Sequence, residues 1–240
     1  MEKRAKLYEG KAKILYATKD PRMVIQHFKD DATAFNGEKK DTIRDKGVVN
    51  NLISSRLMEI LGVVGIPTHF VERLNDRDQL VFKVQIVPVE VVIRNRVAGS
   101  LAKRLGLKEG DQLHRPLVEF YYKSDALGDP LVTVDHVELF GWAEHEEIEW
   151  IVETCHRVND ALLAYFAGID IDLIDYKLEF GRIADDHGEE ALVLADEISP
   201  DTCRLWDRKT GKKLDKDRFR QDLGGITEAY HEVATRMKLM

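Results

Sequence analysis

The chain has 240 residues, of which 44% are hydrophobic and 33% are charged, a balance typical of a globular protein rather than a disordered one. Its formal net charge of -7 repels polyphosphate backbones and argues against nucleic-acid binding over a broad face. The N-terminus has no apolar signal region and no stretch approaches membrane-spanning length, so we expect a soluble, cytoplasmic protein that binds no membrane. The two cysteines, Cys155 and Cys203, have no metal-ligand spacing, and we interpret both as reduced packing residues.

The first ninety residues predict strands and one long helix. Residues 6–18 indicate a hairpin that bends at Gly10, and residues 23–28 and 80–95 are rich in the valine and isoleucine that favour strands. Between these strands, residues 46–67 carry apolar side chains at helical spacing. This part of the chain therefore predicts an antiparallel sheet covered by a helix.

The remainder of the chain predicts more helix. Residues 99–110 contain a short helix, and residues 145–169 show the clearest helical rhythm of apolar positions. A hairpin follows, formed by residues 171–183 and 191–198, and a helix is expected from about Asp215 onward.

Together these elements predict an α+β fold with an antiparallel N-terminal sheet lobe and a mixed α/β C-terminal lobe. We expect the boundary between the lobes to extend over residues 86–96 and not to fall at a single residue. Repeats, low-complexity tracts and long linkers are absent from the sequence.

The stretch DYKLEFG places Asp175, Lys177 and Glu179 on one face of a strand and apolar residues on the other. If residues 187–188 form a two-residue turn, Glu179 stands opposite Asp196 in the hairpin, where like charges destabilise a sheet. A Mg²⁺ ion between the two carboxylates would reverse that interaction, because Mg²⁺ is held by one or two carboxylates together with water and phosphate oxygens. The alternative is a solvated strand face with a longer loop and a shifted register.

Two further stretches suggest phosphate binding. Arg94 and Arg96 precede a Gly-Ser helix start, with Ser100 as a candidate N-cap, and a helix N-terminus with arginines suits a phosphate. Lys11 and Lys13 follow Gly10 on one strand face and could cover nucleotide phosphates. The alternatives are two surface arginines with an ordinary serine cap, and an exposed basic turn.

The last candidates lie on turns and near the C-terminus. Arg204 follows a Ser-Pro-Asp turn close to Asp196, and Arg218 and Arg220 lie downstream, where either could be a surface residue. Asp129 lies in the turn LGDP, where capping is the ordinary role of an aspartate.

Taken together and in order, these stretches resemble the SAICAR synthetase family. The motifs that carry the resemblance span almost the whole chain: YEGKAKILY, KGVVNN, VPVEVVIRNRVAGSLAKRLG, DPLVT, FGW, DYKLEFG, DEISPDTCRLWD and DKDRFRQDLGG. The resemblance implies a two-lobed fold with ATP in the cleft, in which residues 1–90 form an ATP-covering lobe and residues 91–240 form the substrate and metal lobe.

The resemblance also implies an activity. It is that of an ATP-dependent ligase of purine biosynthesis, which joins 5-amino-1-(5-phosphoribosyl)imidazole-4-carboxylate (CAIR) to L-aspartate through an acyl phosphate, with release of ADP and phosphate. ATP and Mg²⁺ are the implied ligands, and a homodimer is the implied assembly. Asn36 is a departure, since the family often has an acidic residue at this position.

Carried onto this sequence, the resemblance implies a set of site residues in four groups. Lys177 and Asp175 are the candidate catalytic residues, and Glu179 and Asp196 are the candidate metal ligands. The expected ATP-binding residues are Lys11, Lys13, Phe82, Lys83, Gln85, Ile86, Glu179 and Asp196. The expected substrate-binding residues are Arg94, Ser100, Asp129, Lys177, Arg204 and Arg220.

Two other functions are alternatives to this one. A phosphotransferase would need a catalytic-loop signature such as H-R-D with a downstream asparagine, which the sequence lacks. A nucleotide-sensing domain would bind Mg-ATP without turnover, with its charged strand facing water.

Overall fold

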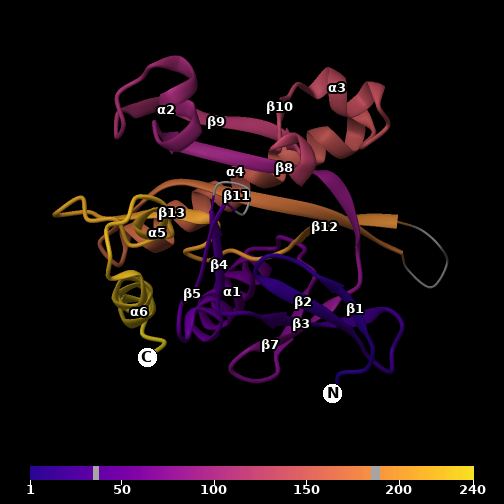
Figure 1. The fold of residues 1–240 in the computed structure, drawn as a ribbon. Coiled ribbons are helices and arrows are strands. Elements are labelled where there is room, and N and C mark those ends of the chain that lie inside the picture. The colour runs from indigo at the N-terminus through magenta and orange to yellow at the C-terminus, as the bar shows by residue number, and fades with distance from the viewer. Residues whose placement is uncertain (35–37, 185–189) are drawn as a thin grey trace.

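The computed structural model describes residues 1–34, 38–184 and 190–240. Two antiparallel sheets organise the fold, and Figure 1 shows one above the other. The N-terminal sheet has the strand order β1 (Lys6–Glu9), β2 (Lys13–Ala17), β3 (Met23–Phe28), β7 (Asp78–Phe82) and β6 (Phe70–Arg73). The expected hairpin and the strand at residues 23–28 are confirmed, whereas the expected strand run over residues 80–95 is divided between β7 and the second sheet.

The second sheet carries most of the charged strand residues. Its order is β10 (Leu131–Val132), β9 (Gln112–Tyr122), β8 (Gln85–Arg96), β11 (Ile171–Ala184) and β12 (Glu190–Ala195), and β13 (Cys203–Asp207) also pairs with β11. Only two residues separate β7 from β8, so the chain passes directly from one sheet to the other. A separate pair is formed by β4 (Asp31–Ala34) and β5 (Lys39–Thr42).

Helices surround these sheets. They are α1 (Lys46–Val63), α2 (Gly99–Leu105), α3 (Val134–Leu139), α4 (His145–Ala167), α5 (Asp217–Arg220) and α6 (Ile226–Arg236), with a 3₁₀ turn η2 (Asp125–Leu127). Over the described residues, no helix is both long and apolar enough to cross a membrane.

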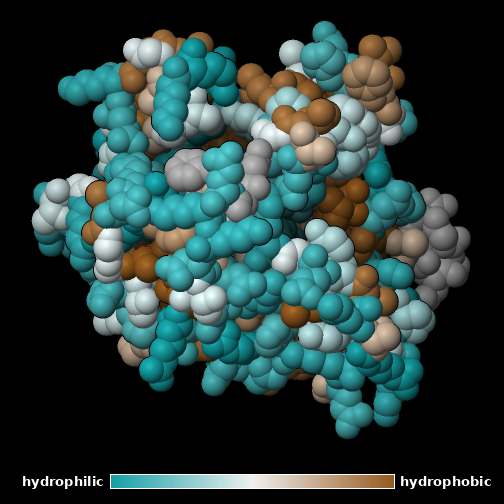
Figure 2. Space-filling model, in the orientation of Figure 1, coloured by the Kyte–Doolittle hydropathy of each residue, from teal (hydrophilic) through white to brown (hydrophobic). Residues whose placement is uncertain are grey.

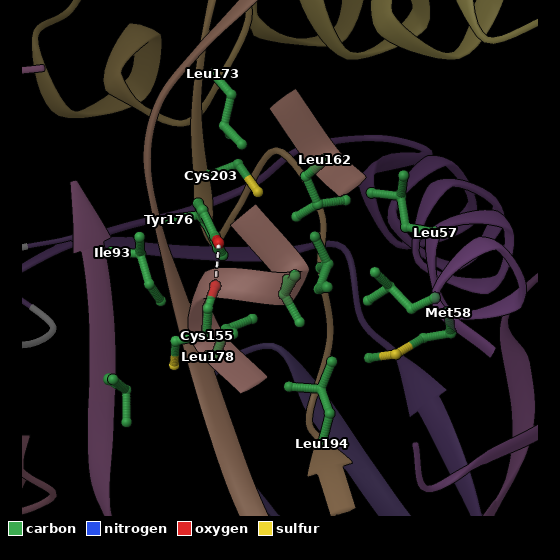
Figure 3. Packing of buried hydrophobic residues seen from close by; sticks show 14 of the residues in the cluster. Leu57, Met58, Ile93, Cys155, Leu162, Leu173, Tyr176, Leu178, Leu194 and Cys203 are labelled. Atoms are coloured by element: carbon green, nitrogen blue, oxygen red, sulfur yellow. Dashed lines mark hydrogen bonds between the residues drawn. The ribbon is translucent and has the colours of Figure 1, made fainter. Parts of the chain in front are cut away.

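The main core forms where α4 packs on β11. The apolar stripe predicted for α4 is confirmed, and its members, apart from the half-buried Val152, are buried against the alternate residues Tyr176, Leu178 and Phe180 of β11. Figure 3 shows the Tyr176 hydroxyl donating to the carbonyl oxygen of Cys155 at 3.4 Å. Cys155 and Cys203 are both buried and unbridged, and burial raises the pKa of both thiols well above the usual range, as expected for packing residues.

The same core includes residues from both predicted lobes. Leu57 and Met58 of α1 belong to one cluster with Tyr176 and Leu194, as Figure 3 shows, and α1 also packs beside α6. The two sheets separate between β7 and β8, but the buried core is continuous across that point. A domain boundary at residue 90 therefore stays a prediction.

Two local expectations are wrong. Ser100 is not the N-cap of its helix: α2 begins at Gly99 with Ala98 as the cap, because the backbone turns sharply at Gly99, where φ is 53°. The C-terminal helix is not continuous, since Gly224 and Gly225 have left-handed backbone conformations and divide the segment into α5 and α6.

Candidate active site

A cleft of about 1270 Å³ contains most of the residues that the sequence singled out. Residues from both sheets line it. The predicted residues in its walls are Lys11, Lys13, Phe82, Lys83, Ile86, Arg94, Ser100, Asp129, Asp175, Lys177, Glu179, Asp196, Arg204 and Arg220. The sequence therefore identified a set of side chains that the fold brings to one cavity.

Gln85, Arg96 and Arg218 are exceptions, because they do not line the cleft among the described residues. Neighbouring residues of a strand point to opposite faces, so Ile86 lines the cleft and Gln85 does not. The backbone N–H groups of Phe82 and Lys83 donate to the carbonyl oxygens of His69 and Arg22, each at 2.7 Å. Any adenine contact in this segment thus depends on other groups.

The predicted pairing of Glu179 with Asp196 is wrong by one residue. Glu179 lies opposite Ala195 in the β11–β12 ladder, and Asp196 follows directly with a left-handed φ of 61°. The turn expected at residues 187–188 falls outside the described residues. The two carboxylates nevertheless come together at Lys177, whose Nζ is 2.8 Å from Glu179 Oε1 and 3.9 Å from Asp196 Oδ2.

Three lysines surround this carboxylate pair. Lys13 forms an ion pair with Asp196, and Lys123 Nζ lies 2.5 Å from Glu179 Oε2. Burial alone would raise the pKa of Asp196, but the ammonium groups of Lys13 and Lys177 lower it well below its usual range. Burial and the Asp196 charge alone would also raise the pKa of Glu179, but Lys177 and Lys123 lower it below its usual value. The two carboxylates therefore stay charged and hold a concentrated set of cations in the cleft.

These carboxylates fit a magnesium ion that arrives with a nucleotide. The described parts of the chain contain no group of three or more His, Cys, Asp or Glu residues that could hold a metal ion by themselves. Mg²⁺ usually takes one or two protein carboxylates and completes its shell with water and phosphate oxygens. Glu179 and Asp196 supply that number of carboxylates beside lysines suited to the phosphate charge.

A second group of charges surrounds Asp175. The buried Arg94 guanidinium donates to Glu119 at 2.6 Å, to Asp175 at 2.7 Å and to Ser100 Oγ at 2.8 Å. Arg204 donates to the same Asp175 carboxylate at 2.9 Å. The hydroxyl of Ser100 thus orients Arg94 instead of capping α2.

Arg94 has little hydrogen-bonding capacity left. A guanidinium has five N–H donors, and Arg94 also donates to the hydroxyl of Tyr121 at 3.1 Å, in addition to Glu119, Asp175 and Ser100. Arg94 can contribute only one further N–H to a substrate, so it cannot bind the phosphate expected from the sequence through two N–H groups.

Gly99 brings α2 close to Arg204. A Cβ atom built at residue 99 would collide with the Arg204 guanidinium, and the positive φ there is also unfavourable for other residues. Glycine at this position therefore lets Arg204 reach Asp175.

The remaining predicted residues have simpler roles in the fold. Asp129 Oδ1 accepts from the Ser124 N–H at 2.9 Å and so stabilises its own turn, while Lys11 pairs with the exposed Asp125 at 2.6 Å. Arg218 donates to backbone carbonyl oxygens near its own turn. These contacts support the capping alternative for Asp129 and a structural role for Arg218.

Several cleft residues were not predicted from the sequence, among them Glu90, Lys123, Tyr121, Glu197, Asp201 and Lys216. Strand periodicity could have found part of this set. Tyr121 and Lys123 follow Glu119 at intervals of two along β9 and just beyond it, and Glu90 precedes Arg94 by four residues on β8. Asp201 and Lys216 carried no such signal, because they reach the cleft from turns.

A two-sheet α+β fold with lysines and paired carboxylates in one cleft is typical of an enzyme that binds and transfers phosphate groups. The family model described as SAICAR synthetase matches residues 6–237. The chain belongs to the SAICAR synthetase family. This membership confirms the family and fold class expected from the sequence, and with them the class of ATP-dependent ligase in purine biosynthesis.

Relatives and solved structures agree with this assignment. The phosphoribosylaminoimidazole-succinocarboxamide synthase of Magnetococcus marinus is 68% identical over 239 residues, covering 100% of this chain and 98% of the relative. The crystal structure of the enzyme with the same name from Ehrlichia chaffeensis has a TM-score of 0.96 at 50% identity, covering 98% of this chain and 99% of the other. A SAICAR synthetase solved in complex with ADP has a TM-score of 0.90 at 48% identity, covering 95% and 96%.

Proposed function

We propose that this chain joins the carboxylate of CAIR to the amine of L-aspartate and converts ATP to ADP and phosphate. The observation that carries the proposal is the meeting of two charged groups in one cleft. One is the pair Glu179 and Asp196 among lysines, and the other is Asp175 between two arginines. Two anionic substrates and a triphosphate need such a concentration of cations.

The lysine-rich group is the proposed ATP end of the cleft. Lys11 and Lys13 lie on and beside the hairpin β1–β2 and would contact the phosphates, while Glu179 and Asp196 would hold Mg²⁺. When bound, Mg²⁺ offsets the negative charge of the triphosphate. The neighbouring segment with Phe82, Lys83 and Ile86 is the proposed wall for adenine, and Gln85 is no longer among the proposed contacts.

The arginine group is the proposed substrate end. Arg204 and Arg220 line the cleft there, together with Ser100 and Asp129, and both the ribonucleotide and L-aspartate would bind at this end. Arg94 orients this group through its hydrogen bonds and offers one further N–H to the ribonucleotide. A ribonucleotide bound here would direct its carboxylate toward Lys177. Lys177 lies two residues after Asp175 on the same face of β11.

The chemistry follows from the poor reactivity of a carboxylate toward amines. A carboxylate oxygen of CAIR attacks the γ-phosphorus of ATP and ADP leaves, which gives an acyl phosphate. The amine of L-aspartate then attacks the acyl carbon and loses a proton, and phosphate leaves with the former carboxylate oxygen. Lys177 lines the cleft and would stabilise negative charge on the transferred group. Much of the rate enhancement would come from positioning, which can supply about 7–11 kcal/mol.

Asp175 is a poor candidate for the base in this reaction. Both of its carboxylate oxygens accept hydrogen bonds from Arg204, and one also accepts from Arg94. We therefore assign Asp175 to positioning the two arginines.

Two properties of the whole molecule also belong to the proposal. Hydrophobic residues gather over α3 at the upper right of Figure 2, where Leu139 and Phe140 are 78% and 59% exposed. This surface supports the homodimer expected from the resemblance, which light scattering would detect as twice the 27.5 kDa chain mass.

The expected cytoplasmic location would be checked by cell fractionation.

ADP formation by the purified protein tests the activity. With Mg-ATP and CAIR present, we expect sustained ADP release only when L-aspartate is added. ADP release that is independent of L-aspartate, or no turnover with all three substrates present, would exclude the proposed reaction.

A further inference from the structure

Lys216 differs from the other lysines enclosed in the cleft. It is the N-cap residue of α5, it lines the cleft, and its side chain is 14% exposed. Its Nζ makes no hydrogen bond to any described residue, and the nearest carboxylate oxygen, Oδ2 of Asp201, is 3.8 Å away. A mostly enclosed ammonium group with no hydrogen-bond acceptor loses part of its hydration without compensation, which makes this position unusual.

Asp201 is already engaged by other groups. Its Oδ2 accepts from the buried Lys46 at 2.6 Å, and its Oδ1 accepts from the hydroxyl of Tyr230 at 2.5 Å. Asp201 therefore lies near Lys216 but does not serve as its hydrogen-bond partner. Burial lowers the pKa of Lys216, as expected for a cation that lacks a close partner.

The comparison with neighbouring lysines shows what is unusual. Lys177 is 2.8 Å from Glu179 and 2.9 Å from Glu90, and Lys123 is 2.5 Å from Glu179. Each has a carboxylate within hydrogen-bonding distance. Of Lys123, Lys177 and Lys216, only Lys216 has no carboxylate within hydrogen-bonding distance, so its ammonium group can bind an anionic ligand.

A second cation, the guanidinium of Arg220, lies one helical turn from Lys216. The backbone N–H of Arg220 donates to the backbone carbonyl oxygen of Lys216 at 3.0 Å, and both side chains line the cleft. Asp217 accepts from Arg220 Nη1 at 2.6 Å and so offsets only part of the charge. Like charges at this spacing repel each other, and a ligand with two anionic groups would relieve the repulsion.

We propose that Lys216 and Arg220 form the subsite for the two carboxylates of L-aspartate, with Lys216 bound to one of them. This inference rests on the proposed function and names the residues that select a dicarboxylate amino acid. Two separate cations on one helical turn suit two separate carboxylates better than one phosphate group. The subsite also adjoins Asp217, which links it through Arg204 to Asp175 at the proposed ribonucleotide end.

Steady-state kinetics of Lys216→Met test the subsite. Methionine keeps most of the length of the unbranched side chain and removes the charge, so we expect the KM for L-aspartate to rise at least about tenfold. The KM values for ATP and CAIR should change less than about threefold, and Lys216→Arg should recover part of the loss. The matched control is Lys212→Met, since Lys212 is exposed and pairs with Glu232 away from the cleft.

Calorimetry with succinate gives a readout that does not depend on turnover. Succinate has two carboxylates and no amine, so we expect it to bind the Mg-ADP form of the unmodified chain and of Lys212→Met, but at least about tenfold more weakly to Lys216→Met. Equal succinate binding by Lys216→Met, or a KM increase confined to CAIR or ATP, would overturn the subsite. Loss of turnover by the unmodified chain would instead contradict the proposed function, and the succinate comparison would still decide the role of Lys216.

Discussion

Arg94 and Asp175 face each other as cross-strand partners on β8 and β11, and Arg94 Nη1 donates to Asp175 Oδ2 at 2.7 Å. Arg204 of β13 is the cross-strand partner of Asp175 on the opposite edge of β11, and it donates to the same carboxylate at 2.9 Å. Asp175 therefore holds two arginines from different strands at one end of the cleft.

We expect Asp175→Ala to lower the free energy of unfolding by about 3–5 kcal/mol, because it leaves two enclosed guanidinium groups without their shared carboxylate. Urea denaturation measures this change. The control is Asp172→Ala on the same strand, where the carboxylate is 25% exposed and the expected loss is below about 1 kcal/mol. Equal losses in the two variants would show that the Asp175 contacts contribute no more than exposed ones.

Gly99→Ala tests whether the close approach of α2 positions Arg204. The added Cβ would displace the guanidinium, and we expect kcat/KM for CAIR to fall about ten- to hundredfold. Gly106→Ala is the matched control at the other end of α2, because it has a similar positive φ of 64° but open space around the new atom. Both variants should lose roughly 1 kcal/mol of stability. A fall in kcat/KM of the same size in both would mean that backbone strain, and not Arg204, is responsible.

Glu179→Gln and Asp196→Asn test the metal site. We expect each variant to lose the increase in ADP affinity that Mg²⁺ gives over EDTA, since one of only two carboxylates is removed. Calorimetric titration with ADP under both conditions measures the difference. Glu190→Gln, an exposed position at the start of β12, is the control. Retention of the Mg²⁺ effect in both site variants would remove the metal assignment.

Asp215 should make stability depend on pH. Burial, followed by the neighbouring Asp217 charge, raises the pKa of Asp215 to about 7. Between about pH 4 and pH 7 the folded chain keeps a proton that the unfolded chain has lost, so this contribution to stability is present at low pH and is lost as the pH rises.

The comparison with Asp215→Asn isolates that contribution. Relative to the unmodified chain, the variant should gain about 1.4 kcal/mol of stability per pH unit between pH 4 and 7, because its side chain does not titrate. Urea denaturation across this range gives the slope. A stability difference that is constant with pH would contradict the raised pKa.

The sequence predicted much of the fold because its periodic patterns determine local structure. The strand alternation of residues 175–180 and the helical stripe of α4 both correspond to the observed buried faces. The predicted register failed by one residue at Glu179, since a register depends on the turn, and the number of residues in a turn cannot be read from strand periodicity.

The candidate site was predictable where charges recur on one strand or belong to a family motif. The hydrogen-bonding state of each side chain was not predictable, because it depends on contacts between distant segments. Arg94 has four hydrogen bonds to other side chains, whereas Lys216 has none to any described residue, and both are simply basic residues in the sequence. Only the three-dimensional structure of the cleft shows that Arg94 is held by protein side chains whereas the Lys216 ammonium group can bind a ligand.

The origin of the oxygen atoms in released phosphate tests the acyl phosphate route most directly. CAIR labelled with ¹⁸O in its carboxylate would be turned over with Mg-ATP and L-aspartate, and the phosphate analysed by mass spectrometry. Transfer of the CAIR carboxylate oxygen to phosphorus predicts one ¹⁸O atom in each phosphate formed from fully labelled substrate. Phosphate without the label would show that ATP is cleaved by water, and that the cleft does not activate this carboxylate.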